Sequence, residues 1–289
     1  MASQHNLPKS AEEGFSDAAA YDTHRPSFSP EAVETFLQNL KVAGQDDVNI
    51  VEIASGTGKF TEVLAARPER YAVKAIEPHG PMREKMVAKD LQAVEVLDGK
   101  ADKMPVADEW GDVCIAAQAF HWFATPEALT EIHRVLRPGA TFGMIWNIDD
   151  YNKPQGWQAT TKWEQRLNEF VWQHDDGLPR FRHQKWQEVF EKQPPATPIQ
   201  AIKNTFADHL PRFSLPLGEN TIRWRIWLSE DALWSRFNTL SQIAVLKGEA
   251  REAAIKLFRE IVQGADVERN EKGEIATHGV TYSAWTDRL

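Results

Sequence analysis

Short apolar runs alternate with amphipathic segments from about residue 47 to residue 147. The apolar runs predict five strands, at 49–53, 71–76, 94–97, 112–117 and 141–146. Between them, apolar residues recur at helical spacing, as in Phe60 and Leu64, and a further helix is expected at about 81–90. The helix that Thr125-Pro126 opens is expected to include Leu136 and to end at Arg137-Pro138-Gly139. Apolar strands alternating with helices indicate a mostly parallel sheet that is covered on both faces.

The segments on either side of this alternation have different patterns. Ser29-Pro30 is typical of a helix start, and the apolar residues that follow at positions 33, 36, 37 and 40 predict an amphipathic helix. Residues 150–200 are expected to form irregular helices. Apolar and polar residues then alternate at 222–228, which predicts a strand with one buried face. Helices at about 230–240 and 249–263 and a last strand at about 275–285 complete the pattern, with antiparallel pairing of the closing strands at a sheet edge.

These elements predict a doubly wound, Rossmann-like α/β fold. It has a mostly parallel seven-stranded sheet with an antiparallel edge, an N-terminal helical segment and an inserted helical cap.

Composition narrows the classes of function. The net charge of −9 argues against nucleic acid as a partner, because nucleic-acid binders usually present a basic surface. The single cysteine, Cys114, excludes an internal disulfide and favours a reducing, cytoplasmic location. No signal-like or membrane-length apolar run is present, so no membrane association is expected. The 11 tryptophans are consistent with an aromatic-lined pocket for a small molecule.

The first strand runs into a glycine turn, Ala54-Ser55-Gly56-Thr57-Gly58, and then into a helix. Glycines let the backbone approach a ligand closely, and a helix start offers free N–H groups to an anion. Glu77 ends the next strand, where a carboxylate can accept hydrogen bonds from ribose hydroxyls. The combination predicts a nucleoside-type cofactor.

The details of the turn favour S-adenosylmethionine over a nicotinamide dinucleotide. Dinucleotide-binding turns carry a third glycine where this chain has Thr61. Glu52, just before the turn, suits a cofactor with a cationic amino-acid end better than one with a diphosphate.

Six motifs in order make the chain resemble class I S-adenosylmethionine-dependent methyltransferases, in particular the small-molecule branch that includes trans-aconitate methyltransferase-like proteins. The motifs are Phe15…Tyr21…Arg25-Pro26, the residues 52–58, Ile76-Glu77-Pro78, Gly99-Lys100-Ala101-Asp102-Lys103-Met104-Pro105, Ala117-Gln118-Ala119-Phe120-His121-Trp122-Phe123 and Arg134-Val135-Leu136-Arg137-Pro138-Gly139. Beyond about residue 150 the likeness is loose.

The resemblance implies a role for each matching residue. Residues 54–58 would wrap the methionine end, Glu77 would hold the ribose, and Gln118 would lie near the transferring methyl group. The implied cofactor-binding set is Tyr21, Arg25, Glu52, Ala54, Ser55, Gly56, Gly58, Glu77, Pro78, Met82, Ala101, Asp102 and Gln118. Two positions depart from the pattern. Ala54 replaces a usual glycine and is expected to have a negative φ, and Lys100 replaces a usual acid, which shifts the adenine contact toward Asp102.

His121 follows the fourth strand, at the edge where ligands bind in this architecture, and is the candidate catalytic residue. With Trp122 and Trp146 it is assigned to the substrate pocket. A hydroxyl acceptor would need a base there, whereas a carboxylate acceptor would not. No metal site is expected, because the histidines lack metal-ligand spacing.

The sequence therefore predicts methyl transfer to a small molecule, an oxygen nucleophile of an organic acid or secondary metabolite. Two alternatives stay open: a non-catalytic cofactor-binding partner or regulatory protein, and an NAD(P)-dependent oxidoreductase. The expected organisation is one domain: a disordered tail at 1–13, N-terminal lid helices at 14–45, a cofactor-binding core at 46–148, a cap or substrate insertion at 149–220, and closing strands and helices at 221–289.

Overall fold

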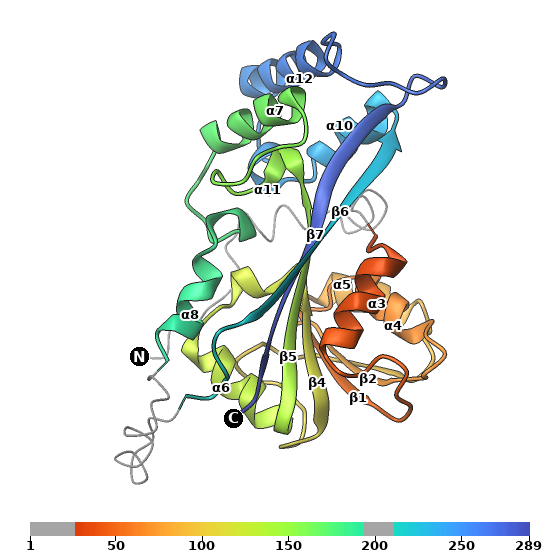
Figure 1. The fold of residues 1–289 in the computed structure, drawn as a ribbon, viewed down its shortest axis with the longest axis vertical. Helices are drawn as coiled ribbons and strands as arrows, with labels where there is room; N and C mark the ends of the chain where they lie inside the picture. Colours follow the sequence, from red (N-terminus) through yellow and green to blue (C-terminus); the bar gives the residue numbers. More distant parts are fainter. Residues whose placement is uncertain (1–26, 194–210) are drawn as a thin grey trace. The chain divides into compact units, whose positions relative to one another are not determined.

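The computed structural model describes residues 27–193 and 211–289 (Figure 1). They divide into two compact units. The first, called the sheet unit, contains the described residues of Ser27–Trp146, Gln184–Thr221 and Tyr282–Leu289. The second, called the helical unit, contains Asn147–His183 and Ile222–Thr281. The five-part division predicted from the sequence stays a prediction.

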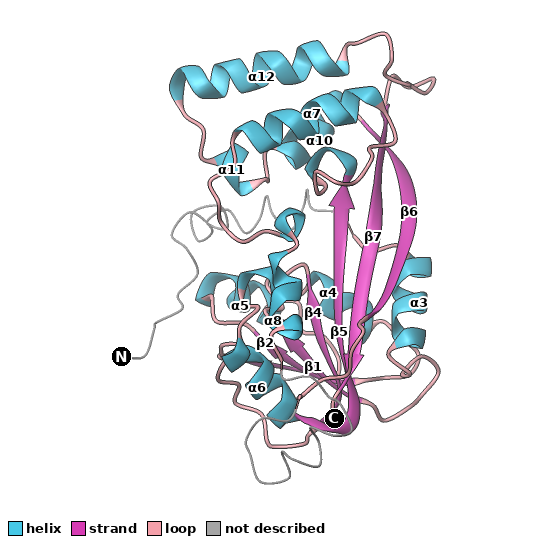
Figure 2. Ribbon diagram, turned by 60° about the vertical axis from the view of Figure 1, so that its left-hand side comes forward, coloured by secondary structure: helices cyan, strands magenta, loops and turns pink. Residues whose placement is uncertain are grey.

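Seven strands form one sheet in the order β3-β2-β1-β4-β5-β7-β6. They are β1 (Asn49–Ile53), β2 (Ala72–Ile76), β3 (Val94–Leu97), β4 (Gly111–Ala117), β5 (Leu136–Asp149), β6 (Gly218–Leu228) and β7 (Ile275–Asp287). The strands from β3 to β5 pair in parallel, and β7 runs opposite to β5 (Figure 2). The predicted mostly parallel sheet with an antiparallel edge is confirmed.

The helices of the sheet unit are α3 (Pro30–Asn39), α4 (Lys59–Ala65), α5 (Gly80–Val87), α6 (Pro126–Val135) and the short α8 (Glu188–Glu191). α3 begins as predicted, since the Ser29 hydroxyl accepts a hydrogen bond from the Ala32 N–H at 3.2 Å. Its apolar stripe packs on the sheet at Gly143, where a Cβ would lie 2.6 Å from Leu40 and 2.8 Å from Phe36. Only a residue without a side chain allows this approach.

The junction of α6 and β5 differs from the prediction. Leu136 was expected on the helix, but α6 ends at Val135 and Leu136 pairs with Gly111 as the first residue of β5. The strand register then shifts at the exposed Arg137-Pro138-Gly139. Proline disfavours helical backbone in the residue before it, so the chain becomes extended earlier than the apolar periodicity suggests.

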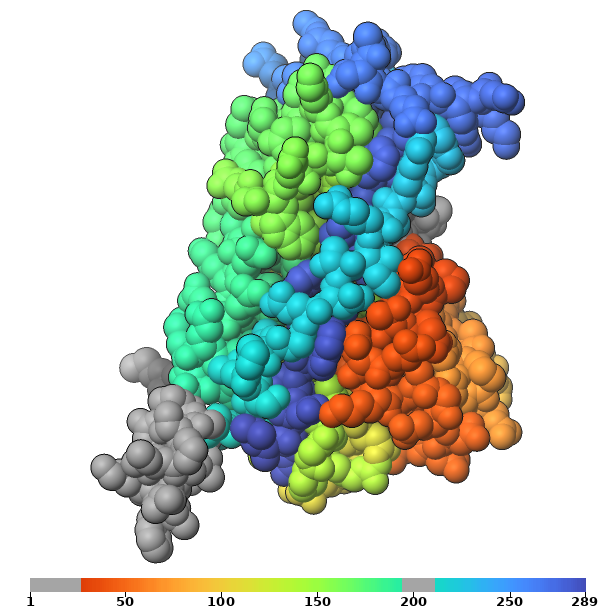
Figure 3. Space-filling model, in the orientation of Figure 1, coloured from red at the N-terminus to blue at the C-terminus, as the bar shows by residue number. Residues whose placement is uncertain are grey.

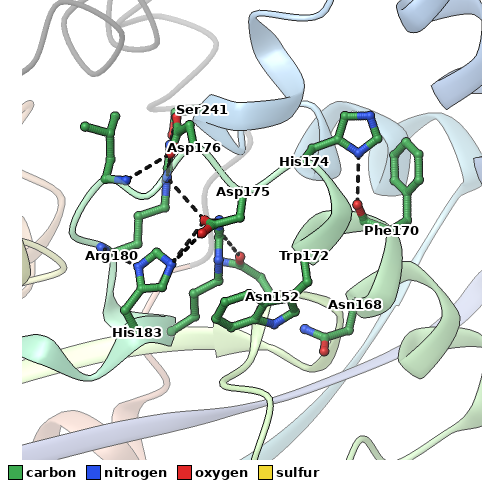
Figure 4. Close-up of polar contacts among 12 residues, drawn as sticks. Asn152, Asn168, Phe170, Trp172, His174, Asp175, Asp176, Arg180, His183 and Ser241 are labelled. Atoms are coloured by element: carbon green, nitrogen blue, oxygen red, sulfur yellow. Dashed lines mark hydrogen bonds and ion pairs between the residues drawn. The ribbon is translucent and has the colours of Figure 1, made fainter.

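The helical unit packs α7 (Lys162–Gln173), α10 (Glu230–Phe237), α11 (Ser241–Ala244) and α12 (Gly248–Val262) around a core of its own. Polar contacts fix its connecting segments (Figure 4). The Asp175 carboxylate accepts hydrogen bonds from Arg182 at 2.6 Å and from His183 at 3.1 Å. The Arg180 guanidinium joins Asp176 to the Ser241 hydroxyl. These contacts hold the segment after α7 against α11.

β6 alternates half-buried and exposed residues along its length, so the alternation predicted at 222–228 is present, but its inner face is half-buried and not buried. Its side chains are visible along one face of the molecule in Figure 3. Within the two described ranges, no helix has both the length and the apolar character needed to cross a bilayer.

Candidate functional site

Two backbone hydrogen bonds fix the turn between β1 and α4, one to β2 and one within the turn itself. The Ser55 N–H donates to the Ile76 carbonyl of β2 at 3.1 Å, and the Gly58 N–H donates to the Ser55 carbonyl at 2.9 Å. Gly56 and Gly58 have φ values of +59° and +83°. At Gly58 a Cβ would lie 2.7 Å from Met86, so both conformation and space require glycine there.

Ala54 opens this turn in the left-handed region, with φ +52°. The expectation of a negative φ was wrong. Its neighbour Ser55 is tied to β2, and this long-range hydrogen bond fixes the path of the chain at the end of β1. A left-handed conformation costs a residue with a Cβ roughly 1–2 kcal/mol, which the turn imposes on Ala54.

Glu77 joins the end of β2 to the same turn. One carboxylate oxygen accepts from the Gly56 N–H and the other from the His79 N–H, both at 2.8 Å. The residue is 4% exposed. Burial raises the pKa of Glu77 above its usual value, and the two backbone hydrogen bonds oppose that rise. The carboxylate is therefore held in a fixed position beside the turn.

Glu52 lies within β1, two residues before the turn begins at Ala54. It is 1% exposed, and its carboxyl group accepts a 2.7 Å hydrogen bond from the Thr61 hydroxyl of α4. Burial raises the pKa of Glu52 to about 8, while the Thr61 hydroxyl acts in the opposite direction. The position at which dinucleotide-binding turns carry a third glycine thus holds a side chain that contacts this acid.

Other predicted residues surround the turn less tightly. Met82 of α5 is buried, and a Cβ on Gly56 would lie 3.8 Å from its sulfur. Pro78 is half-buried. Ala101 is half-buried and Asp102 is exposed within the turn that Lys100 and Lys103 close. The structure therefore joins Gly56 and Glu77 directly by a hydrogen bond, whereas Asp102 lies in an exposed turn. Tyr21 and Arg25 lie outside the described residues.

The exit of β4 carries the candidate catalytic residue. Gln118 has φ +59°, and its N–H donates to the Ile145 carbonyl at 2.8 Å. A single 3₁₀ turn, Phe120–Trp122, follows. The Trp146 indole N–H donates to Nδ1 of His121 at 3.1 Å. An indole N–H can only donate, so Nδ1 accepts and a neutral His121 carries its proton on Nε2.

Trp146 itself is fully buried and lies in an aromatic cluster on the β5 side of the sheet unit. Its ring centroid lies 4.9 Å from that of Trp186 and 6.0 Å from that of Tyr282. It therefore orients His121 from within the core. The imidazole of His121 also lies 4.9 Å from the half-buried Trp122 ring. The sequence reasoning missed Trp186 and Tyr282, which reach this cluster from segments far along the chain and carry no local signal.

A separate cavity of about 430 Å³ lies at the opposite edge of the parallel strands, where β4 begins. It is lined by Asp108, Glu109, Thr130, His133, Arg134, Arg212 and Arg288. Two of its guanidinium groups are already paired, Arg134 with Asp108 and Arg288 with Glu109. Of the assigned cofactor and substrate residues that the structure describes, none lines this cavity.

Comparison with known proteins also identifies a methyltransferase domain within the sheet unit. Residues 51–144 match the sequence model of a methyltransferase domain. That range contains the turn, Glu77 and the β4 exit. Residues 51–144 form a class I S-adenosylmethionine-dependent methyltransferase domain.

Two proteins of Schizosaccharomyces pombe are similar to this chain. An uncharacterized methyltransferase-like protein is 30% identical over 60% of this chain and 63% of its own length. An uncharacterized methyltransferase is 34% identical over 48% of this chain and 53% of its own length. The chain thus spans between 53% and 63% of the length of these relatives.

A solved structure shares the fold. It is phosphoethanolamine N-methyltransferase 2 of Haemonchus contortus, in complex with phosphomonomethylethanolamine and S-adenosylhomocysteine. The TM-score is 0.51 at 13% identity, covering 100% of this chain and 61% of that chain. The match to a methyltransferase domain disfavours the oxidoreductase alternative.

Proposed function

We propose that the protein transfers a methyl group from S-adenosylmethionine to a carboxylate oxygen of a small organic acid. The observation that carries the proposal is the 2.8 Å hydrogen bond between the Gly56 N–H and the Glu77 carboxylate. It fixes a glycine turn and a hydroxyl-binding acid side by side, at the carboxyl ends of adjacent parallel strands, where ligands bind in this architecture.

The residues present fit the cofactor. Gly56 leaves the inner side of the turn without a side chain, and each Glu77 oxygen has a second lone pair for a ribose hydroxyl. Ala54, Ser55 and Gly58 would follow the methionine end, Pro78 and Met82 would lie beside the ribose, and Ala101 and Asp102 beside the adenine. Gln118 would lie near the methyl group, with Tyr21 and Arg25 completing the set.

When bound, the cofactor supplies an electrophilic methyl group on a sulfonium. The task of the protein is to hold a nucleophilic oxygen in line with the methyl–sulfur bond and to exclude water. In this proposal, His121 performs the first of these roles. Because Nδ1 accepts from Trp146, Nε2–H is a donor that can bind one carboxylate oxygen while the other oxygen attacks.

This tautomer favours a carboxylate over a hydroxyl acceptor. A hydroxyl must lose its proton, and a neutral His121 in this arrangement has no lone pair on Nε2 to accept it. A carboxylate is already ionised at neutral pH and needs no base. An aromatic acceptor that bears a carboxylate would also suit the Trp122 ring beside His121.

The proposal is tested first by calorimetry with S-adenosylmethionine, S-adenosylhomocysteine, NAD and NADP. We expect binding of the first two alone. A metabolite extract is then incubated with a labelled methyl donor, and the product is identified by mass. A methyl ester releases its label as methanol in mild alkali, whereas a methyl ether retains it. Binding without turnover on any acceptor would support a non-catalytic partner protein instead.

Two substitutions at one position separate the roles of His121. His121→Gln keeps an N–H donor near the Nε2 position but has no basic nitrogen, and His121→Ala keeps neither. If His121 donates, the Ala variant loses roughly 10–100-fold in kcat/KM and the Gln variant retains most of it. Equal loss in both variants would show that His121 is a base and that the acceptor is a hydroxyl.

The remaining assignments concern the cellular location of the protein and the class of its substrate. Cys114 is buried and reduced, which accords with a cytoplasmic enzyme. The net charge of −9 favours a small-molecule substrate over nucleic acid. Fractionation of cells that express the tagged protein tests the location.

A further inference from the structure

Glu52 is a carboxyl group inside an apolar sheet. It lies between Ala75 of β2 and Ile115 of β4 in the strand register, and it is 1% exposed. The residue two positions later, Ala54, begins the turn that we assign to the methionine end of the cofactor. Glu52 is thus two residues from that turn along the chain, and it is almost fully shielded from solvent.

The Glu52 carboxyl has one side-chain hydrogen bond among the described residues, the 2.7 Å bond from the Thr61 hydroxyl. Thr61 is itself fully buried, with its hydroxyl 3.8 Å from the Met86 sulfur of α5. No lysine, arginine or histidine of the described chain forms an ion pair with Glu52. An ionised Glu52 would therefore have a single neutral hydrogen-bond donor. One such hydrogen bond is too weak to offset the free-energy cost of burying a charged carboxylate.

The ionisable groups near Glu52 do not stabilise its ionised form either. Just after β2, the Glu77 carboxylate raises the pKa of Glu52, because it carries a charge of the same sign. On β4, burial raises the pKa of the Cys114 thiol well above its usual value, so that group is neutral. Next to α5, Lys89 pairs with Glu62 of α4 at 3.0 Å. Glu52 is therefore neutral in the free protein at pH 7.

We propose that Glu52 gives up its proton when the cationic methionine end of S-adenosylmethionine binds, and that the Thr61 hydroxyl positions the resulting carboxylate. This inference rests on the proposed cofactor site. The methionine end of the cofactor carries an ammonium, a sulfonium and a carboxylate, and an adjacent Glu52 carboxylate stabilises its net positive charge. The proton leaves for the buffer, and the Thr61 hydroxyl keeps donating to the ionised oxygen. Glu52 becomes a counter-ion that exists only in the complex.

The expected pH dependence follows from the free-protein pKa of about 8. Below that value, binding must first remove the proton, so affinity rises with pH. If Glu52 is fully ionised in the complex, the affinity increases by up to about ninefold between pH 6 and pH 7. This window lies below the usual range of an α-amino group, about 7.7–8.0, so the charge of the cofactor itself changes little.

The experiment is calorimetry at pH 7 in two buffers, phosphate and Tris, that differ in ionisation enthalpy. The difference in apparent binding enthalpy gives the number of protons released. We expect close to one proton with S-adenosylmethionine and none in Glu52→Gln. Methylthioadenosine, which has the nucleoside but neither positive charge, should bind without release. Because Glu77 is unchanged in Glu52→Gln, the difference between the two proteins isolates Glu52.

Thr61 is tested with a matched pair of variants. Thr61→Val keeps the shape and removes the hydroxyl, so ionised Glu52 becomes less favourable and the rise in affinity moves to higher pH. Thr61→Ser restores the hydroxyl and the wild-type profile. A purely structural Thr61 would change the melting temperature of Thr61→Val but not its pH profile.

The outcomes distinguish this inference from the proposed function. Binding of S-adenosylmethionine without proton release, or with equal release in wild type and Glu52→Gln, overturns the inference and leaves the proposed function intact. Absence of S-adenosylmethionine binding under all conditions overturns both.

Discussion

Replacement of Glu77 by glutamine tests the centre of the proposed cofactor site. The variant keeps the shape of the side chain and one acceptor oxygen, but its amide nitrogen faces a backbone N–H. Glu77 accepts from two such groups at 2.8 Å, Gly56 and His79, so one of these bonds is lost. A hydrogen bond to a charged group contributes roughly 1.5–3 kcal/mol, and an unsatisfied buried N–H adds a cost of roughly 1–3 kcal/mol.

The effect on the cofactor is separable from the effect on stability. A ribose hydroxyl that loses a charged acceptor also loses roughly 1.5–3 kcal/mol of binding energy, which is about 10–100-fold in Kd. Calorimetry with S-adenosylhomocysteine measures this loss, and thermal unfolding measures the cost to the fold. Glu95→Gln is a matched control, since Glu95 is exposed on β3. A folded Glu77→Gln protein with wild-type affinity would refute the assignment of Glu77 to the ribose.

Three further predictions concern the same unit. Ala54→Gly should stabilise the protein by up to about 1 kcal/mol, because glycine removes the strain at φ +52°; a lower melting temperature would contradict this. Trp146→Phe removes the donor to His121 Nδ1 and should lower kcat while leaving the Kd of S-adenosylhomocysteine unchanged; equal losses in both would place Trp146 in the cofactor site instead. The pKa of Glu52 is raised by folding from 4.5 to about 8, so its contribution to stability is complete below pH 4.5 and declines as pH rises toward 8. Unfolding of wild type and Glu52→Gln across that range should show the decline in wild type; the same slope in the variant would assign it to another group.

The fold was largely predictable because its signals are local. β1 and β3 have the predicted bounds, since a short apolar run with polar flanks suits a strand covered on both faces. α3 begins at Pro30 because Ser29 caps it, and both residues are adjacent in sequence. The α6–β5 junction was placed wrongly, because the apolar Leu136 continues the helical periodicity whereas the following Arg137-Pro138 and the pairing with Gly111 favour a strand.

The site was predictable in its residues but not in their contacts. Glu77 could be identified from its place after β2, but its bonds to Gly56 and His79 depend on how two strands meet. The φ of Ala54 is set by a neighbour that bonds to β2, so the residue type alone gave the wrong sign. The tautomer of His121 depends on Trp146, which lies 25 residues further along the chain. Such contacts arise only when distant segments pack together.

The position of β6 at the edge of the sheet bears on self-association of the protein at high concentration. It ends the strand order, and the outer side of such a strand offers unpaired N–H and carbonyl groups to another chain. Arg223 and Arg225 are exposed along it, and the Arg225 guanidinium lies 4.5 Å above the Trp227 ring, covering an apolar surface with a charged group. Two copies that met edge to edge would bring these like charges together. Because Arg225 is paired with Glu268, the repulsion between two such edges falls mainly on Arg223, and added salt weakens it by screening.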